Sequence, residues 1–252
     1  MDLDGTLYSG GMAIPGAADA LKRLARRGRP YKLVTNTTSR SRSMLVDRLR
    51  GYGFEATAED LFTAILAGGE LARAAGYTCV APFTLEPALD DLQAFELVGG
   101  SSGRRAHRVP DAILVGDLGE RWTYALMQEA FEYLTDGAAF IALSRDRYWL
   151  KDERLALDAG PFVAGLEFAT GTMATVAGKP SPAFYRAAIR SLGLSQSAAV
   201  VMVGDDLWSD VEGAQRAGLQ GWLVRTGKYR ESILRNSGIR PDRVLDSIAA
   251  LE

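Results

Sequence analysis

The chain has 252 residues, 47% of them hydrophobic, and a formal net charge of −2. It can therefore bury the core of one large domain or two smaller ones, and its charge provides no general attraction to nucleic acid or to an anionic membrane. The single cysteine cannot form an internal disulfide, and one cysteine with one histidine provides too few ligands for a typical zinc cluster. The sequence has neither a signal-peptide pattern nor an apolar run of membrane length, which predicts a cytoplasmic protein.

The N-terminal stretch Asp2-Leu3-Asp4-Gly5-Thr6 has two carboxylates two positions apart, where a strand would turn into a loop. Both acids can face one small site, which suits Mg²⁺, because this cation usually binds one or two carboxylates beside phosphate and water. One acid can attack phosphorus while its neighbour transfers the proton. An acidic turn is the alternative for the stretch alone. An EF-hand calcium loop is disfavoured, because it needs Glu where this chain has Ala13.

The next expected elements are a helix over residues 17–25 and a short buried strand over residues 31–34. The strand would carry Thr35 and Asn36 at its carboxyl end, which is the edge where open α/β sheets bind ligands. A hydroxyl and an amide there can bind phosphoryl oxygens without adding charge. An N-cap for the following helix, expected over residues 39–49, is the alternative.

A helical pattern over residues 58–75 ends at Gly76, after which the character of the chain changes. The following segment contains strands and helices but no acid pair of the N-terminal kind. Because Gly-rich connectors lie near both ends of this segment, we expect an inserted α+β domain at residues 77–175 between the core segments 1–76 and 176–252. Its expected strands are 77–81, 112–115 and 140–143, and its expected helix is 122–134.

Residues 145–151, Arg-Asp-Arg-Tyr-Trp-Leu-Lys, follow an expected strand of the insert and combine aromatic surface with cations. Tyr148 and Lys151 are therefore candidates for substrate binding, in an insert that could close over a site and expel water. Aromatic and arginine side chains also stabilise dimer interfaces, so a homodimer formed through the insert is the alternative.

The stretch Gly178-Lys179-Pro180-Ser181 follows the insert and precedes an expected helix at residues 184–192. The ammonium group of Lys179 can stabilise charge on a phosphoryl group and on an attacking carboxylate. A Walker A loop is excluded, because Pro follows the Lys and the preceding glycine spacing is wrong.

An apolar strand expected at residues 199–203 ends just before Asp205, which is the natural third carboxylate for a metal ion. Whether Asp206 also binds the metal stays open, whereas Asp210 is expected one layer further out, where it would orient Lys179 or a metal-bound water. A helix N-terminus enriched in acids is the alternative for this stretch. A last strand is expected at residues 219–224, followed by a polar segment and a terminal helix.

The motifs resemble, in this order, the four signature motifs of the haloacid dehalogenase-like (HAD) phosphohydrolases. The spacing is similar to that of the nagD-type subgroup, which has a large C2-type cap between the second and third motifs. Further stretches look like the branch that contains phospholysine phosphohistidine inorganic pyrophosphate phosphatase, and the resemblance covers nearly the whole chain. The signature motifs are residues 2–6, 33–36, 178–181 and 201–206 with Asp210, and the further stretches are 142–149, 159–162, 178–182 and 225–230.

This resemblance implies a doubly wound α/β core with an inserted cap, and magnesium-dependent hydrolysis of a small phosphorylated metabolite through an aspartyl-phosphate. It implies Asp2 as nucleophile and metal ligand, Asp4 as general acid/base and ligand through its carbonyl, and Asp205 as the remaining protein ligand. The phosphoryl oxygens would be held by Thr35, Asn36 and Lys179. A phosphomonoester, pyrophosphate or a phosphoramidate fits the relatives, and no residue selects the leaving group.

The chain departs from the family pattern at its start. Relatives have an apolar strand before the first Asp, whereas only Met1 precedes Asp2 here, and a strand usually needs about five residues. We expect either that the native chain begins upstream of Met1 or that Asp2 lacks the anchor of a central strand. The second case favours a non-catalytic protein of the same fold that binds a phosphorylated ligand.

Overall fold

The computed structural model describes residues 1–151, 154–195 and 199–251, excluding the side chains of residues 150 and 151. The chain divides into two compact units, which are described separately. Unit 1 contains Met1–Thr35, Ser43–Phe62 and Lys179–Glu252, and unit 2 contains Asn36–Arg42 and Thr63–Gly178. Unit 2 is therefore an insertion in the sequence of unit 1.

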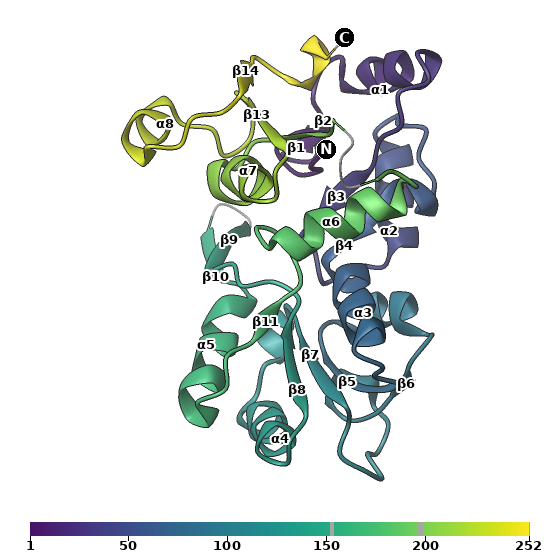
Figure 1. Ribbon diagram of the computed structural model, residues 1–252, viewed down its shortest axis with the longest axis vertical. Helices are drawn as coiled ribbons and strands as arrows, with labels where there is room; N and C mark the ends of the chain where they lie inside the picture. Colours follow the sequence, from purple (N-terminus) through teal and green to yellow (C-terminus); the bar gives the residue numbers. More distant parts are fainter. Residues whose placement is uncertain (152–153, 196–198, 252) are drawn as a thin grey trace. The chain divides into compact units, whose positions relative to one another are not determined.

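The strands of unit 1 are short (Figure 1), and β3, β4 and β12 are largely apolar. β12, β13 and β14 are adjacent and parallel, whereas β3 pairs with β4, and an antiparallel hairpin of β1 and β2 follows the N-terminal acids. Strands buried on both faces are typically continuous hydrophobic runs of this kind. The bounds are β1 (Tyr8–Ser9), β2 (Met12–Ala13), β3 (Leu33–Thr35), β4 (Leu61–Thr63), β12 (Val201–Gly204), β13 (Gln220–Val224) and β14 (Arg243–Leu245).

Residues 1 and 2 connect the two parts of this sheet. Asp2 N donates to the carbonyl oxygen of Val203 in β12, and Val34 N in β3 donates to the carbonyl oxygen of Met1, both at 2.8 Å. The spatial order is therefore β4, β3, residues 1–2, β12, β13 and β14. From residues 1–2 the chain adds β3 and β4 on one side and β12, β13 and β14 on the other, so the order of strand addition reverses between residues 1–2 and β12. Open α/β sheets bind ligands at the carboxyl ends of the strands beside such a reversal.

Helices of unit 1 bury apolar faces against this sheet, in a core that includes Leu3, Leu33 and Val203. Arg23 in α1 donates to the carbonyl oxygens of Ala249 at 2.6 Å and Leu251 at 2.9 Å, so the C-terminal turn lies beside α1 (Figure 1). The helical bounds are α1 (Ala17–Arg26), α2 (Arg42–Gly51), η1 (Ala58–Asp60), α6 (Pro182–Ser191), η5 (Leu207–Glu212), α7 (Gly213–Arg216), α8 (Glu231–Ser237) and η6 (Ile248–Ala250).

Thr6 is fully buried, and its hydroxyl oxygen has no hydrogen-bond partner among the described residues. A buried polar group without a partner costs about 1–3 kcal/mol, so we expect Thr6→Val, which keeps the shape and removes the hydroxyl, to raise the free energy of unfolding by about 1 kcal/mol. Urea unfolding of both proteins measures the change. A loss of stability of that size would mean that the hydroxyl has a partner in solution.

Unit 2 contains a second sheet, in which the order β11, β8, β7, β5, β6 is parallel throughout, and a separate antiparallel hairpin of β9 and β10. Alternate residues of β5, β7 and β8, among them Phe83, Val115 and Phe140, form a core with α4 and α5. The bounds are α3 (Ala64–Ala74), β5 (Cys79–Phe83), η2 (Glu86–Leu92), β6 (Glu96–Leu97), η3 (Gly100–Ser102), β7 (Ala112–Val115), η4 (Gly119–Arg121), α4 (Tyr124–Thr135), β8 (Ala139–Ala142), β9 (Tyr148–Lys151), β10 (Arg154–Leu157), α5 (Ala159–Thr170) and β11 (Thr175–Val176).

Two element predictions were wrong. The helix expected over residues 58–75 is a helical turn, then β4, then α3, because Leu61-Phe62-Thr63 pairs with β3 and the Thr63 hydroxyl accepts from Leu66 N as the cap of α3. A short apolar run is compatible with either a strand or a helix. The polar segment after α8 also contains a strand, β14, which pairs with β13.

The bounds of the compact units also differ from the predicted domain bounds at residues 76/77 and 175/176. The contacts group α3 with unit 2, because a Cβ added to Gly68 would lie 2.3 Å from Leu143 Cδ2, just past β8. Residues 36–42 join the same unit, where Arg42 Nε donates to Asp91 Oδ1 at 2.8 Å. The role of residues 77–175 as a cap stays a prediction.

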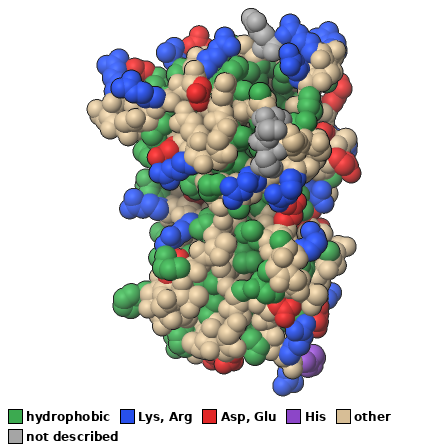
Figure 2. Space-filling view, in the orientation of Figure 1, with side chains coloured by type: hydrophobic (Ala, Val, Ile, Leu, Met, Phe, Trp, Pro, Cys, Tyr) green, Lys and Arg blue, Asp and Glu red, His purple; other side chains and the backbone are tan. Residues whose placement is uncertain are grey.

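The surface has mixed charge. On the face drawn in Figure 2, Lys and Arg side chains are scattered, with Asp and Glu side chains between them, as the net charge of −2 would suggest. In the part of the chain that the structure describes, every helix is too short or too polar to cross a membrane. The cytoplasmic location and the absence of a nucleic-acid or membrane partner stay predictions.

Candidate active site

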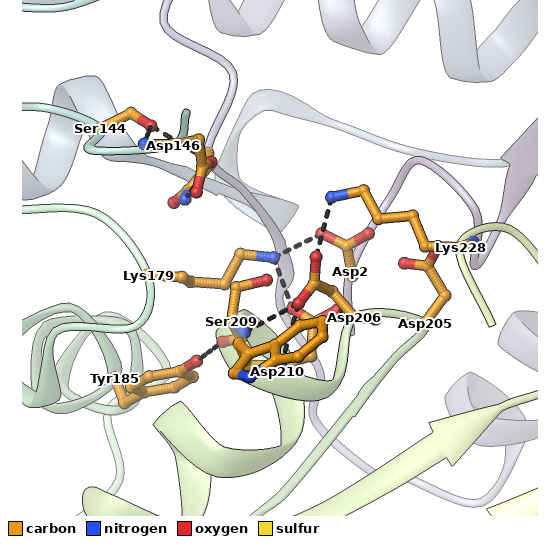
Figure 3. A network of polar contacts seen from close by, with 12 residues as sticks. Asp2, Ser144, Asp146, Lys179, Tyr185, Asp205, Asp206, Ser209, Asp210 and Lys228 are labelled. Carbon is orange, nitrogen blue, oxygen red and sulfur yellow. Dashed lines mark hydrogen bonds and ion pairs between the residues drawn. The ribbon is translucent and has the colours of Figure 1, made fainter. Parts of the chain in front are cut away.

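Lys179 lies at the centre of a buried charged group in unit 1 (Figure 3). Its ammonium group donates to Asp2 Oδ1 at 2.5 Å and to Asp210 Oδ1 at 2.7 Å, and the residue is only 3% exposed. Burial alone would lower the pKa of this lysine, but the charges of Asp2 and Asp210 raise it well above its ordinary value. Lys179 is therefore a permanent positive charge in contact with both carboxylates.

Asp205 follows β12 and is enclosed by backbone. Its Oδ2 accepts from Lys228 N at 2.7 Å, and a Cβ added to Gly5 or Gly227 would lie 2.0 or 2.1 Å from the same oxygen. Both glycines have positive φ, +83° and +59°, which residues with a Cβ rarely adopt. The local sequence thus leaves room for the Asp205 carboxylate between two tight turns.

Asp206 forms the cap of η5. Its Oδ1 accepts from the backbone N of Trp208 and of Ser209, both at 3.0 Å, and its Oδ2 accepts from Lys228 Nζ at 2.9 Å. Burial raises the pKa of this carboxyl, but the Lys228 charge and the two amides outweigh that effect and lower it. Both oxygens of Asp206 are therefore committed to protein donors.

Asp210 lies within η5 and is 1% exposed. Besides its contact with Lys179, its Oδ2 accepts from Asp206 N at 3.1 Å. A Cβ added to Gly204 would lie 2.1 Å from Asp210 Oδ2, so the glycine at the end of β12 permits this close approach. Asp210 contacts Lys179, and its role of orienting that lysine stays a prediction.

Carboxylates outnumber cations in this buried group. One carboxylate oxygen each from Asp2, Asp205 and Asp210 lies within 4.8 Å of the other two, and the buried ammonium group of Lys179 pairs with Asp2 and Asp210. If all three acids were ionised, two negative charges would be uncompensated. Burial, with the charges of Asp2 and Asp210, raises the pKa of Asp205 to about 8. Burial and the Asp2 charge raise the pKa of Asp210 to about 6, against the opposing effect of Lys179.

The donor set and the charge of this group fit a hard divalent cation. Carboxylate oxygens are the side-chain ligands that Mg²⁺ and Ca²⁺ prefer, and two positive charges would balance the two uncompensated negative ones. Asp210 is already hydrogen-bonded through both oxygens, so Asp2 and Asp205 are the side chains better placed to bind a cation.

Two family models match the chain, one described as haloacid dehalogenase-like hydrolase at residues 1–97 and one as HAD-hydrolase-like at residues 176–251. Human haloacid dehalogenase-like hydrolase domain-containing protein 2 is 40% identical over 234 residues, which cover 92% of this chain and 85% of that protein. The chain belongs to the haloacid dehalogenase-like hydrolase family. The predicted family, and the prediction of an enzyme of this hydrolase class, are confirmed.

Two further similarities involve proteins named as phosphatases. Human phospholysine phosphohistidine inorganic pyrophosphate phosphatase is 33% identical over 256 residues, covering 99% of this HAD-like hydrolase and 90% of that protein. The fold is similar to that of glycerol phosphate phosphatase from Mycobacterium tuberculosis in complex with magnesium, with a TM-score of 0.85 and 30% identity over 100% of this chain and 74% of that chain. The predicted α/β fold class is confirmed.

Two other predicted site residues of this HAD-like hydrolase lie in unit 1. Thr35 ends β3, one residue past Val34, which pairs with Asp2, and it is buried. The carboxylate of Asp4 is exposed and does not belong to the group of Asp2, Asp205 and Asp210. The general acid/base role of Asp4 stays a prediction.

The remaining three predicted residues lie in unit 2. Asn36 Nδ2 donates to Asp146 Oδ2 at 3.1 Å within that unit. Tyr148 begins β9 and is 54% exposed, while Lys151 ends the same strand and its side chain lies outside the described part of the chain. The substrate-binding roles of Asn36, Tyr148 and Lys151 stay predictions.

The sequence reasoning assigned no role to three residues that hold this site. The Tyr185 hydroxyl in α6 donates to the carbonyl oxygen of Ser209, and Thr226 and Lys228 contact the acidic turns. For Thr226 and Lys228, the sequence signal was a Gly between a hydroxyl and a cation shortly after a strand. Its meaning depends on which loop lies opposite, which a single sequence does not state.

Proposed function

We propose that this HAD-like hydrolase is a magnesium-dependent phosphatase that hydrolyses a small phosphorylated metabolite through an aspartyl-phosphate. The observation that carries this proposal is the buried group of Asp2, Lys179, Asp205 and Asp210 at the carboxyl ends of the central strands. The names of the two phosphatases described above support phosphate as the group transferred.

Asp2 is the proposed nucleophile. One of its oxygens attacks phosphorus and forms an O–P bond while the bond to the leaving group breaks, and Asp4 gives that group a proton. Water then attacks the same phosphorus, Asp4 accepts a proton from the water, and inorganic phosphate leaves with the Asp2 carboxylate restored. Lys179 orients Asp2 throughout and offsets negative charge on the phosphoryl group.

Mg²⁺ is the proposed cofactor. The carboxylates of Asp2 and Asp205, and by resemblance the main-chain carbonyl of Asp4, would hold it, while Asp206 and Asp210 lie one layer out and Asp210 acts through Lys179. When bound, the cation supplies charge neutralisation of the phosphoryl oxygens. The magnesium complex of the similar glycerol phosphate phosphatase supports this choice.

Substrate contacts are proposed for four residues. The Thr35 hydroxyl and the Asn36 amide are suited to phosphoryl oxygens, and Tyr148 and Lys151 to the rest of the metabolite. In this proposal residues 77–175 form the cap. The exposed aromatic side chains of β9, Tyr148 and Trp149, also suit contact with a second copy of the chain, so cross-linking of the purified protein tests a homodimer.

The purified chain can be assayed for phosphate release from phosphomonoesters, pyrophosphate and phosphoramidates. We expect at least one of them to be hydrolysed with Mg²⁺ and none after chelation of the metal. Tight binding of one compound without hydrolysis would instead identify a non-catalytic phosphate-binding protein. That alternative assumed an unanchored Asp2, whereas the Met1–Asp2 peptide unit is hydrogen-bonded to Val34 in β3 and to Val203 in β12.

Asp205→Asn is expected to raise the Mg²⁺ concentration for half-maximal rate by about 100-fold or more, because losing even a group that only hydrogen-bonds a metal ligand typically costs about 10–100-fold in affinity. Part of the lost rate should return at high Mg²⁺. Asp246→Asn is the matched control, since that acid is 89% exposed and pairs with Arg225 at the surface. A rate loss that saturating Mg²⁺ leaves unchanged would argue against Asp205 as a ligand.

A further inference from the structure

Residues 226–228 form a loop that follows β13 and contacts the acidic site. Thr226 Oγ1 donates to the carbonyl oxygen of Gly5 at 2.5 Å, and Lys228 N donates to Asp205 Oδ2 at 2.7 Å. One short loop therefore binds both the turn that follows the first acid pair and the acid that follows β12. These are the two chain segments on either side of the strand-order reversal.

Gly227 lets this loop approach closely. A Cβ there would lie 2.1 Å from Asp205 Oδ2 and 2.5 Å from Gly5 Cα, and its φ of +59° is unfavourable for any residue with a Cβ. A Cβ on Gly5 would lie 2.0 Å from the same carboxylate oxygen. The Asp205 carboxylate is thus confined between two glycine turns that the Thr226 hydroxyl ties together, and its orientation follows from the placement of both turns.

The backbone of the loop contributes more to this confinement than the charge of Lys228. The Lys228 side chain is 70% exposed, and its ion pair with Asp206 is screened by water. The Lys228 amide, in contrast, donates to a carboxylate that is 3% exposed, and hydrogen bonds to a buried charged acceptor are the strong ones. Removing the ammonium group leaves this amide in place.

We propose that residues 226–228 form a positioning loop for the cation ligand Asp205, acting through the Thr226 hydroxyl, the close approach of Gly227 and the Lys228 amide. The loop holds the carboxylate in one orientation before a cation arrives, so that binding does not have to order it. This inference rests on the proposed cation site. It adds that the affinity of the site for Mg²⁺ depends on a loop that contributes no ligand of its own.

Calorimetric titration of the full chain with Mg²⁺ alone tests the loop without any substrate. Thr226→Val removes the hydroxyl and keeps the shape, while Gly227→Ala adds the Cβ that meets Asp205. We expect each to weaken Mg²⁺ binding by about 10–100-fold, because hydrogen-bond partners of metal ligands have effects of that size. Thr226→Ser and Lys228→Met, which keep the hydroxyl and the amide, should stay within about threefold of the unchanged chain.

Thermal unfolding of the metal-free variants shows whether each is folded. If Gly227→Ala does not fold, the difference in Mg²⁺ binding between Thr226→Val and Thr226→Ser decides whether the loop positions Asp205. Wild-type-like binding by folded Thr226→Val and Gly227→Ala would overturn the positioning role and leave the proposed function intact. Equal weakening by Lys228→Met would also overturn it, in favour of the side-chain charge. Failure of the unchanged chain to bind Mg²⁺ would contradict the proposed cofactor as well.

Discussion

Asp2→Asn is expected to lower the rate of phosphate release by about 10⁴-fold or more while the protein remains folded. The substitution keeps the size of the side chain, and the amide oxygen can still accept from Lys179, which lies 2.5 Å from the present carboxylate. A neutral amide, however, is not a nucleophile towards phosphorus. Single-turnover assays with the best substrate of the panel measure the loss, and Asp47→Asn, an exposed acid of α2, is the control.

A trapped phosphoryl mimic locates the same step independently of rate. With Mg²⁺ and beryllium fluoride, a crystal structure should contain the fluoride complex on an oxygen of Asp2. Density on Asp4 or Asp205 would show that the nucleophile had been assigned to the wrong acid, even in an active phosphatase. A normal rate in Asp2→Asn would contradict the aspartyl-phosphate altogether.

The sequence predicted much of the candidate site because the relevant residues follow strand ends. Asp2, Lys179 and Asp205 are far apart in the chain, but Asp205 follows a short apolar run, Lys179 lies in a Gly-Lys-Pro turn, and Asp2 belongs to an acid pair followed by Gly and Thr. Parallel strands bring their carboxyl ends to one edge, so the approximate meeting place followed from the pattern. The contact of Lys179 with both Asp2 and Asp210 agrees with that expectation, whereas the catalytic roles await experiment.

The pattern failed where tertiary contacts decide the local structure. Leu61-Phe62-Thr63 is as apolar as the helix that follows it, and its strand conformation depends on the neighbouring β3. The roles of Thr226 and Gly227 depend in the same way on Gly5, which is more than two hundred residues away in sequence. A single sequence records the residue types but not which loops face one another.

Lys179→Met is expected to have the second large effect, on both stability and rate. Methionine preserves most of the volume but leaves Asp2 and Asp210 buried without their shared cation, and breaking a buried ion pair from one side costs about 3–5 kcal/mol. The rate should fall by about 10²–10³-fold, because charge on the phosphoryl group loses its stabilising partner. Unlike the loss in Asp205→Asn, this one should persist at saturating Mg²⁺.

The double variant Lys179→Met/Asp210→Asn separates the two effects. Asp210 is 1% exposed, so neutralising it removes one of the two buried charges that Lys179→Met leaves unpaired. We expect about 1–3 kcal/mol of unfolding free energy to return relative to Lys179→Met, measured by urea unfolding, with no recovery of rate. If rate returned together with stability, Lys179 would act only by holding the fold. If neither returned, Asp210 would matter to the site through more than its contact with Lys179, since its Oδ2 also accepts from Asp206 N at the start of η5.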